Sequence, residues 1–199
     1  MSGQVSIQAS ETATRQWISP RQAETVQALV DAALTELRSS GYEGLTVRSV
    51  AREAGAAPAT AYNYFSSKEH LVTEVFWRRL EDLADPLPDR RRSVTNRVAA
   101  ALTEFATFVG SEPALAHACT AAMLGADLEV ARLRRRIGAE MHRRIAVAAG
   151  DDADEDALAT IDLVVTGALV NAGMGHMAYD DLGPVLTAAA ARVLNGAHT

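Results

Sequence analysis

The chain of 199 residues contains one cysteine, one lysine and few aromatic residues, which make up 5% of it. A single cysteine, Cys119, excludes an internal disulfide framework and fits a reducing cytoplasm. No apolar run looks long enough to span a bilayer, and the first seventeen residues lack the basic start and apolar centre of a signal peptide. We therefore expect a globular cytoplasmic protein with no membrane partner.

An excess of basic residues is also missing. The formal net charge is −6 and the isoelectric point is about 5.4, and residues 1–70 hold six basic and seven acidic side chains. An acidic chain is not an obvious nucleic-acid binder, so any contact with a phosphate must rest on a few charges at fixed positions. The arginine runs 90–92 and 134–136 are interpreted as a linker and a solvated helix face rather than as a nucleic-acid patch.

Motifs for catalysis and metal binding are absent from the sequence. It has no nucleophile elbow, no glycine-rich phosphate loop and no zinc-type spacing. His117 and Cys119 are two residues apart, so on a helix they point away from each other and make poor joint ligands. His142 and His176 lack partners in the sequence. We expect no catalytic residue, no metal site and no cofactor, and therefore not an enzyme.

Apolar residues recur at helical spacing along most of the chain. The first stripe consists of Ala23, Val26, Val30, Ala33 and Leu37. Ser19, Pro20 and Gln22 in front of it form a capping box with proline at the first helical position. Because no alternating β pattern and no internal repeat is found, the sequence predicts an all-α fold.

Two short helices joined by a glycine turn are predicted between Thr46 and Phe65. Thr46 suits an N-cap, Gly55 a left-handed C-cap, and Pro58 the first turn of the second helix. Ala61 and Phe65 lie on the inner face of that second helix. The pattern is a helix-turn-helix, whose second helix can enter a major groove of DNA.

A further helix is predicted to open at a capping box formed by Ser66 and Glu69 and to run to about Leu83. The stretch DPLPDRRRS, with two prolines and an arginine run, then marks the best domain boundary. Beyond it the sequence predicts five helices, roughly at 94–110, 113–124, 127–149, 154–179 and 182–194.

The stretch GYEGLTVRSVAREAGAAPATAYNYFSSKEHL, residues 41–71, resembles the DNA-binding segment of TetR-family transcriptional regulators. The resemblance extends over about residues 21–76. It implies a sequence-specific DNA-binding regulator with a three-helix DNA-binding domain at 19–66, a connecting helix at 67–84 and a ligand-binding and dimerisation domain at 85–199. Residues 1–18 are expected to be a disordered tail or arm.

The resemblance also implies roles for individual residues of the helix-turn-helix. Tyr62 and Lys68 would hold phosphates, while Asn63 and Tyr64 would read base edges. The full implied DNA-binding set is Thr46, Arg48, Pro58, Ala59, Thr60, Tyr62, Asn63, Tyr64 and Lys68. Ala57 departs from the family pattern, in which a serine commonly caps this helix, and Ala61 stands where leucine is common. We hypothesise that the second helix is mobile without DNA.

The C-terminal part is expected to hold a small-molecule effector and to form a homodimer. Apolar groups with a few polar ones suit a ligand cavity; the candidates are Trp77, Phe105, Phe108, Met123, Met141, Asn171 and Met174, although plain core packing is the alternative for each. Small residues in the last two helices favour close helix approach between subunits. The interface candidates are Gly167, Ala168, Gly175, Ala178, Leu186 and Val193; an ordinary buried helix within a monomer is the alternative.

The sequence thus predicts a homodimeric repressor that is released from a palindromic operator in double-stranded DNA by a small, mainly hydrophobic ligand. The alternative is a TetR-like ligand-binding or adaptor protein with a weakened DNA-binding head.

Overall fold

The structure, a computed structural model, describes residues 19–86 and 89–196. Within these ranges it contains helices and no strand, which confirms the all-α prediction. The predicted tail at 1–18 lies outside the described residues. In chain order the elements are α1 (Pro20–Gly44), α2 (Val47–Glu53), α3 (Pro58–Tyr64), α4 (Lys68–Glu81), α5 (Val94–Ser111), α6 (Pro113–Met123), α7 (Leu128–Ala149), η1 (Gly150–Asp152), α8 (Glu155–Gly173), η2 (Tyr179–Asp181) and α9 (Leu182–Gly196).

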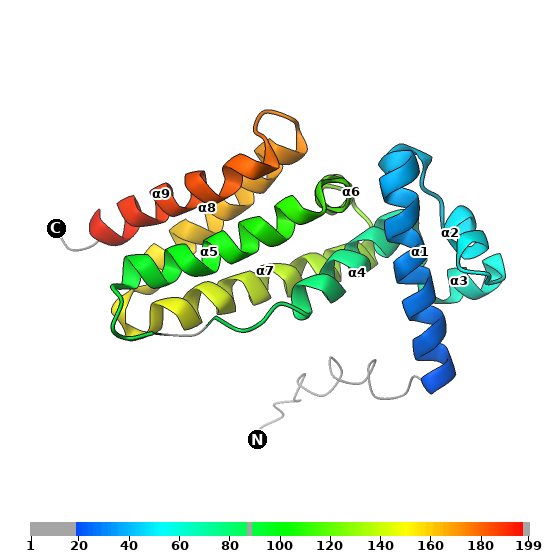
Figure 1. Cartoon of the computed structure of the whole chain (residues 1–199), viewed down its shortest axis with the longest axis horizontal. Coiled ribbons are helices and arrows are strands. Elements are labelled where there is room, and N and C mark those ends of the chain that lie inside the picture. Colours follow the sequence, from blue (N-terminus) through cyan, green and yellow to red (C-terminus); the bar gives the residue numbers. More distant parts are fainter. Residues whose placement is uncertain (1–18, 87–88, 197–199) are drawn as a thin grey trace, which may run out of the picture.

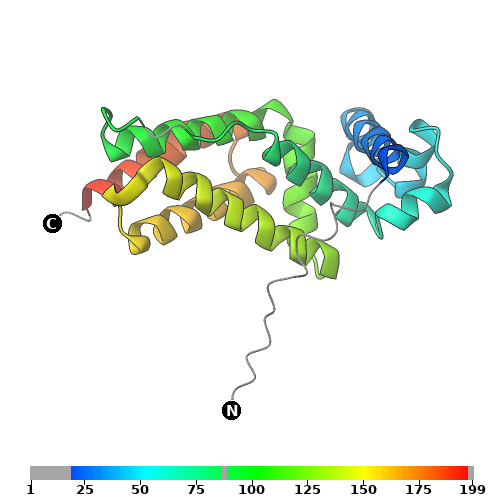
Figure 2. The ribbon, with the colours of Figure 1, turned by 90° about the horizontal axis from the view of Figure 1, so that it is seen from below.

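The helices form two parts that one helix connects (Figure 1). Helices α1 to α3 make up the head at one end of the molecule, and helices α5 to α9 make up the elongated body. Helix α4 runs from the head into the body, as the view from below also shows (Figure 2). A displacement of α4 would therefore be felt in both parts.

Helix α1 begins as the sequence predicts. The Ser19 hydroxyl accepts from the backbone N–H of Gln22, and the Gln22 side chain accepts from the N–H of Ser19. Four members of the predicted stripe, Val26, Val30, Ala33 and Leu37, are buried, whereas Ala23 is exposed. The helix is broken by Gly41, which has φ 65°, a conformation that favours glycine over other residues. This break turns the chain towards α2.

Helix α6 lies at the junction of head and body. It packs against α1 of the head, against α4, and against α8 of the body. Helix α5 packs along α9 and α7 and places Leu102 and Phe105 in the core, both at most 1% exposed. Head and body therefore share one continuous hydrophobic core, which runs through α4 and α6.

Helix α8 departs from the sequence predictions in two respects. It ends at Gly173, not near Tyr179, because Gly175 takes φ 76° and the chain turns into η2. By length and composition alone it could cross a membrane, so the expectation of no such run was wrong. Only 33% of the most apolar 18-residue stretch of this helix is buried within the chain, and the side chain of Leu163 is 73% exposed. This helix thus presents apolar surface that the rest of the chain does not cover.

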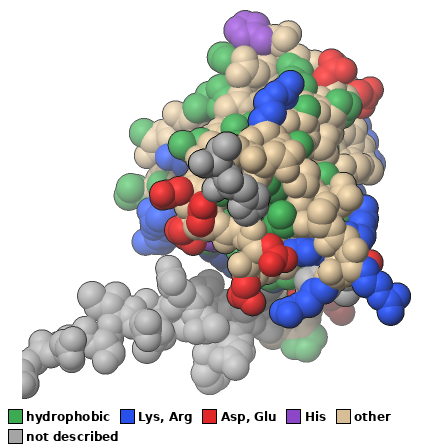
Figure 3. All heavy atoms as spheres, turned by 90° about the vertical axis from the view of Figure 1, so that its left-hand side faces the viewer, with side chains coloured by type: hydrophobic (Ala, Val, Ile, Leu, Met, Phe, Trp, Pro, Cys, Tyr) green, Lys and Arg blue, Asp and Glu red, His purple; other side chains and the backbone are tan. Residues whose placement is uncertain are grey.

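The end of the body that lies farthest from the head carries acidic and basic side chains close together (Figure 3). Arg90 and Arg92 border a shallow hollow there together with Asp151, Asp152 and Asp154. Because the carboxylates offset the arginines, this end is not a basic patch, in agreement with the interpretation of run 90–92 as a linker.

Candidate nucleic-acid interface

Helix α2 is held firmly at its start and along its inner face. The Thr46 hydroxyl accepts from the Ser49 N–H at 2.9 Å, and the Ser49 hydroxyl lies 3.2 Å from the Thr46 N–H, so the two residues form a capping box. Val47, Val50 and Ala51 are buried. The predicted cap at Thr46 is therefore confirmed, but its reciprocal partner Ser49 was not foreseen.

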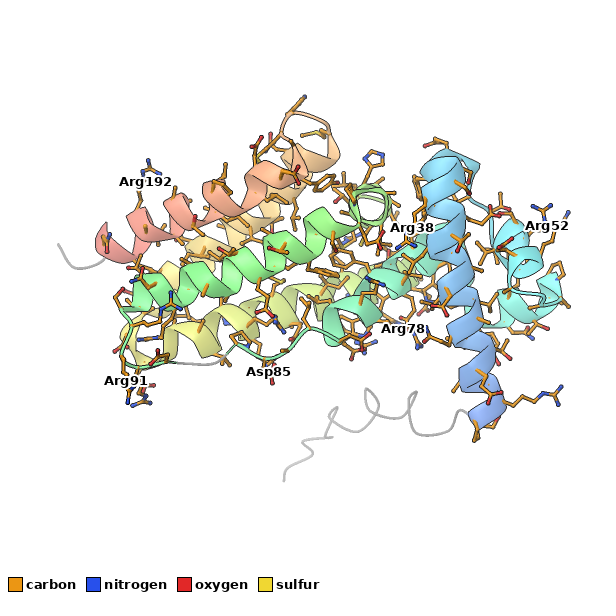
Figure 4. All side chains as sticks on the ribbon, in the orientation of Figure 1. Arg38, Arg52, Arg78, Asp85, Arg91 and Arg192 are labelled. Atoms are coloured by element: carbon orange, nitrogen blue, oxygen red, sulfur yellow. The ribbon has the colours of Figure 1, made fainter. Side chains whose placement is uncertain are left out.

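The charged side chains of α2 point away from the core. Arg48 and Arg52 are both exposed, and Arg52 extends from α2 on the side away from the body (Figure 4). Among the described residues neither arginine has an ion pair. Both are therefore available to an anionic partner.

The turn between α2 and α3 follows the predicted glycine chemistry. Gly55 takes φ 66°, and the Ala56 N–H donates to the Ala51 carbonyl at 2.8 Å. Ala57 stands at the N-cap of α3 and offers no side-chain hydrogen bond, while Pro58 occupies the first turn. The weak start that the sequence indicated is present in the structure.

Helix α3 is seated on the head by its inner residues. Ala61 is fully buried and Phe65 is 2% exposed. On the outer side Pro58, Ala59 and Asn63 are exposed. The outer face thus presents small and hydrogen-bonding groups on a helix thin enough to enter a groove.

The tyrosines of α3 lie in different environments. Tyr62 is 50% exposed, whereas Tyr64 is half-buried, packs against the core, and has its ring 6.5 Å from that of Phe65. Thr60 is also partly covered. The arrangement places Tyr62 and Asn63 outward and gives Tyr64 a larger packing role than the resemblance implied.

Helix α4 begins one residue later than the predicted capping box would place it. Its N-cap is Ser67, whose hydroxyl accepts from the His70 N–H at 3.0 Å. The expectation that Ser66 and Glu69 form the box was wrong, because Ser66 instead contacts the His70 ring. The N-terminal position of Lys68 on α4 is unaffected.

Lys68 is held beside α1 by Tyr42. Its Nζ donates to the Tyr42 carbonyl at 3.1 Å and lies 4.3 Å from the centre of the Tyr42 ring. The Tyr42 hydroxyl in turn donates to Glu69 at 3.1 Å. Burial, followed by the charge of Glu69, raises the pKa of Tyr42.

One polar contact ties the head to the residue before α6, and another ties the start of α4 to the turn after α6. Arg38 of α1 forms an ion pair with Glu112 just before α6, and it lies on the side of α1 that faces the body (Figure 4). The Ser67 hydroxyl donates to Asp127, after α6, at 2.8 Å. That bond, together with backbone N–H groups of α7, lowers the pKa of Asp127. The start of α4 is therefore fixed to the turn before α7.

Five of the seven residues predicted to line an effector cavity belong to the hydrophobic core or pack against it. Trp77, Phe105, Phe108 and Met141 are buried in the core, and Met123 is half-buried. Arg136 covers Trp77 with its guanidinium 4.4 Å from the ring centre, a contact that the interpretation of run 134–136 as a solvated face missed.

Two of those predicted residues lie on the surface instead. Asn171 is exposed and donates to the Gly167 carbonyl of its own helix, and Met174 is 54% exposed. As lining residues of an interior cavity both predictions were wrong, because the end of α8 leaves the body at this point.

The structure instead contains an open groove of about 950 Å³ between the end of α4 and the outer face of α5. Of the predicted ligand residues, Phe108 alone borders it; the other lining residues are Arg79, Asp82, Leu83, Arg92, Asn96, Ala99, Ala100, Thr103, Glu104, Thr107 and Ser111. Their spacing along α5 is helical, but no sequence signal shows that α4 returns beside them.

The predicted interface residues also separate into two groups. Gly167, Gly175 and Ala178 are exposed and Val193 is half-buried. Leu186 and Ala168 are buried within their own subunit, so a direct contact with a second copy was the wrong expectation for them. On α8 and α9, exposed apolar side chains that sequence reasoning missed include Leu163 and Val185.

The head therefore defines the chain as a DNA-binding protein of the helix-turn-helix class. The model of the bacterial regulatory proteins of the tetR family matches residues 29–75. An uncharacterised HTH-type transcriptional regulator of Mycobacterium tuberculosis (strain ATCC 25618 / H37Rv) is 42% identical over 183 residues, which cover 89% of this chain and 84% of the relative. The chain belongs to the TetR family of transcriptional regulators.

Another relative is the HTH-type transcriptional repressor KstR of Rhodococcus jostii, 32% identical over 73% of this chain and 70% of the relative. Among solved structures, a TetR transcriptional regulator from Rhodococcus sp. RHA1 is similar with a TM-score of 0.73 and 21% identity, over 89% of this chain and 98% of that one. The regulator FadR from Bacillus subtilis, solved in complex with stearoyl-CoA, has a TM-score of 0.59 and 17% identity, over 85% and 98%. These likenesses establish the fold.

Proposed function

We propose that this TetR-family regulator is a cytoplasmic homodimeric repressor that leaves a palindromic operator when a small, mainly hydrophobic ligand binds to its body. The observation that carries the proposal is the outer face of α3, where Asn63 and Tyr62 are exposed. In this proposal residues 19–66 bind DNA, 67–84 connect, and 85–199 bind the ligand and the second subunit.

Phosphate binding would start from the arrangement around Tyr42. Lys68 stands at the first turn of α4, where backbone N–H groups already favour an anion. A phosphate at this turn would accept from both sources, with Thr46 and Tyr62 as further donors. A few donors at fixed positions then dock DNA although the chain as a whole is acidic.

Sequence reading would fall to α3 and the start of α2. Asn63 can pair bidentately with an adenine, and Arg48 can pair with a guanine or a phosphate. Pro58 and Ala59 offer apolar contact to thymine methyl groups, with Thr60 beside them. Tyr64, being half-buried, is assigned chiefly to holding the helix in place.

Selection of bound fragments from a random DNA pool, followed by titration of the selected site, tests the proposal. Lys68→Ala should weaken binding to all sequences alike, whereas Asn63→Ala should also relax the preference at one position, by about 1–3 kcal/mol. Arg192→Ala, on the outer side of α9 far from the head (Figure 4), is the control and should bind as the wild type does. Failure to select any sequence would favour the adaptor alternative.

The second subunit is proposed to cover the apolar surface of α8 and α9. Leu163 is 73% and Val185 43% exposed, and exposed groups of this size commonly mark an interaction site when they cluster. Leu163→Glu should convert the dimer to a monomer in analytical ultracentrifugation, while Leu128→Glu, at the equally exposed start of α7, should not. A wild-type chain that sediments as a monomer would contradict the proposal.

The effector site is assigned to the body because α4 joins the body to the head, so that a ligand bound in the body can act on the head through α4. FadR, which shares this fold, was solved with stearoyl-CoA, a molecule that joins a long apolar acyl chain to a charged nucleotide group. By linkage, a ligand that favours one arrangement of the heads must change operator affinity by the same factor by which the operator changes ligand affinity.

A further inference from the structure

The groove between α4 and α5 is a built feature, because buried arginines anchor the chain that borders it at both ends. Arg144, 3% exposed, donates to the carbonyls of Leu83 and Ala84 at the end of α4. Arg97, 6% exposed, donates to the Arg92 carbonyl at 2.8 Å and to two carbonyls of α7. The segments on either side of the groove are thus pinned to the body.

The floor of the groove is long and partly apolar. The floor is the outer face of α5, where Ala99, Ala100 and the side of Phe108 offer apolar surface. It extends from Asn96 to Ser111, about 22 Å at the helical rise of 1.5 Å per residue. The shape therefore suits a long, narrow molecule rather than a compact one.

Charges in the groove leave one arginine poorly compensated. Glu104 lies 3.6 Å from buried Arg144 and forms an ion pair with it. Among the residues that the structure describes, Arg79 has only Glu112 within ion-pair distance, at 3.9 Å, and that carboxylate already pairs more closely with Arg38. Asp82 and Arg92, at other points of the lining, balance each other in sign. An anionic group would find its best partner at Arg79.

We propose that this groove binds an elongated amphipathic anion, with its apolar part along α5 and its acid group on the Arg79 guanidinium. This inference rests on the proposed ligand response. It places the ligand-binding site on the outside of the body rather than among the packed core residues. A carboxylate suits Arg79 because the guanidinium can donate two parallel hydrogen bonds to it. The volume of about 950 Å³ lies within the range of known ligand sites.

The same arginine gives the groove a connection to the head. Glu112 is shared between Arg79, which faces the ligand, and Arg38 of α1. A ligand acid that engages Arg79 withdraws it from Glu112 and leaves that carboxylate to Arg38 alone. Occupancy of the groove would thereby alter the tie between α1 and the body, and with it the setting of the head.

Calorimetric titration of the full chain with dodecanoate, dodecanol and dodecylammonium tests the site. Dodecanoate should bind most tightly, and Arg79→Gln should weaken it about tenfold, as expected for loss of a charged hydrogen bond, with little effect on dodecanol. Ala100→Leu, which fills the floor, should weaken the acid and the alcohol alike. Ala139→Leu, at an exposed position of α7, is the matched control. Melting curves confirm that each variant is folded.

Several outcomes would overturn the site: no binding of dodecanoate, equal binding of the acid and the ammonium ion, or full binding by folded Ala100→Leu. The connection to the head has its own readout, since Glu112→Gln should still bind dodecanoate but no longer change operator affinity on doing so. An unchanged response in that variant rejects the connection. A chain that binds dodecanoate in this groove but no operator would refute the proposed function and leave the site standing.

Discussion

Helices α2 and α3 of the helix-turn-helix are each seven residues long, but their first turns are held in different ways. Helix α2 has a reciprocal capping box between Thr46 and Ser49 and three buried side chains. Helix α3 has Ala57 at its N-cap, no side-chain hydrogen bond there, and one buried side chain, Ala61. Helix α2 is supported by its own sequence, whereas α3 is supported by the residue that comes directly after its last turn.

The difference in packing between α2 and α3 has a functional explanation. A helix that enters a groove must leave most of its surface free, so few of its side chains can pack on the head. In α3 the support is concentrated in Phe65, which comes after the helix, is 2% exposed, and sets its ring edge-on to His70 at 5.8 Å. We infer that α3 depends on Phe65 as its main anchor, with Tyr64 as a second support, more than α2 depends on any one residue.

Removal of the anchor should have the largest effect. Phe65→Ala should lower the free energy of unfolding by about 3–5 kcal/mol, the usual cost of deleting a buried phenylalanine ring. Chemical denaturation followed by circular dichroism measures it. Tyr62→Ala, three residues away and half-exposed, is the control and should lower the free energy of unfolding far less. Similar losses in both variants would show that Phe65 is not the main anchor of α3.

The features of the head that the sequence predicted correctly are those encoded within a few residues. Thr46 as a cap, Gly55 in the left-handed region and the inward positions of Ala61 and Phe65 all derive from local chemistry. The misplaced cap of α4 shows the limit of such reasoning. Two adjacent serines both fit the pattern, and the structure selects Ser67, whose hydroxyl also reaches Asp127 sixty residues later.

A smaller loss of stability is expected when the N-terminal cap of α2 is removed. Thr46→Ala removes the acceptor of the Ser49 N–H, and loss of such a cap typically costs about 1 kcal/mol. The free energy of unfolding should fall by that amount, and amide exchange should quicken in the first turn of α2. The change Thr46→Ser keeps the hydroxyl and should restore most of the stability; if it does not, the capping bond is not the cause.

The groove and the ties between head and body were beyond prediction from the sequence. Arg79 and Glu112 lie on separate elements, and Arg38 is 74 residues from Glu112 in the chain. Nothing in the spacing of these charges shows that α1, α4 and the start of α6 meet. Likewise, Leu186 belongs to an apolar stripe whose direction, inward or towards a second subunit, depends on how α9 packs on α5.

A side-chain cap added at the N-terminus of α3 should make this helix more stable and bring it closer to α2. Ala57→Ser supplies the missing cap of α3 and should add up to about 1 kcal/mol of stability. Amide exchange across residues 58–65 should slow relative to the wild type, because the helix is then held at both ends. Strong, uniform protection of this segment in the free wild-type protein would reject the hypothesis that α3 is mobile without DNA.

The smallest effect concerns the pH dependence of the tie between the start of α4 and the turn before α7. The pKa of Asp127 is lowered, first by the Ser67 hydroxyl and also by the backbone of α7. A carboxyl group with a depressed folded pKa contributes stability above its unfolded pKa of about 3.9, and that contribution is lost as the pH falls through the folded value. Asp127→Asn keeps an oxygen for the hydroxyl and for the cap of α7 but does not titrate. The melting temperature of the wild type should therefore fall more steeply than that of Asp127→Asn as the pH is lowered below 4. Parallel curves would show that the carboxylate charge does not stabilise the junction between the start of α4 and the body.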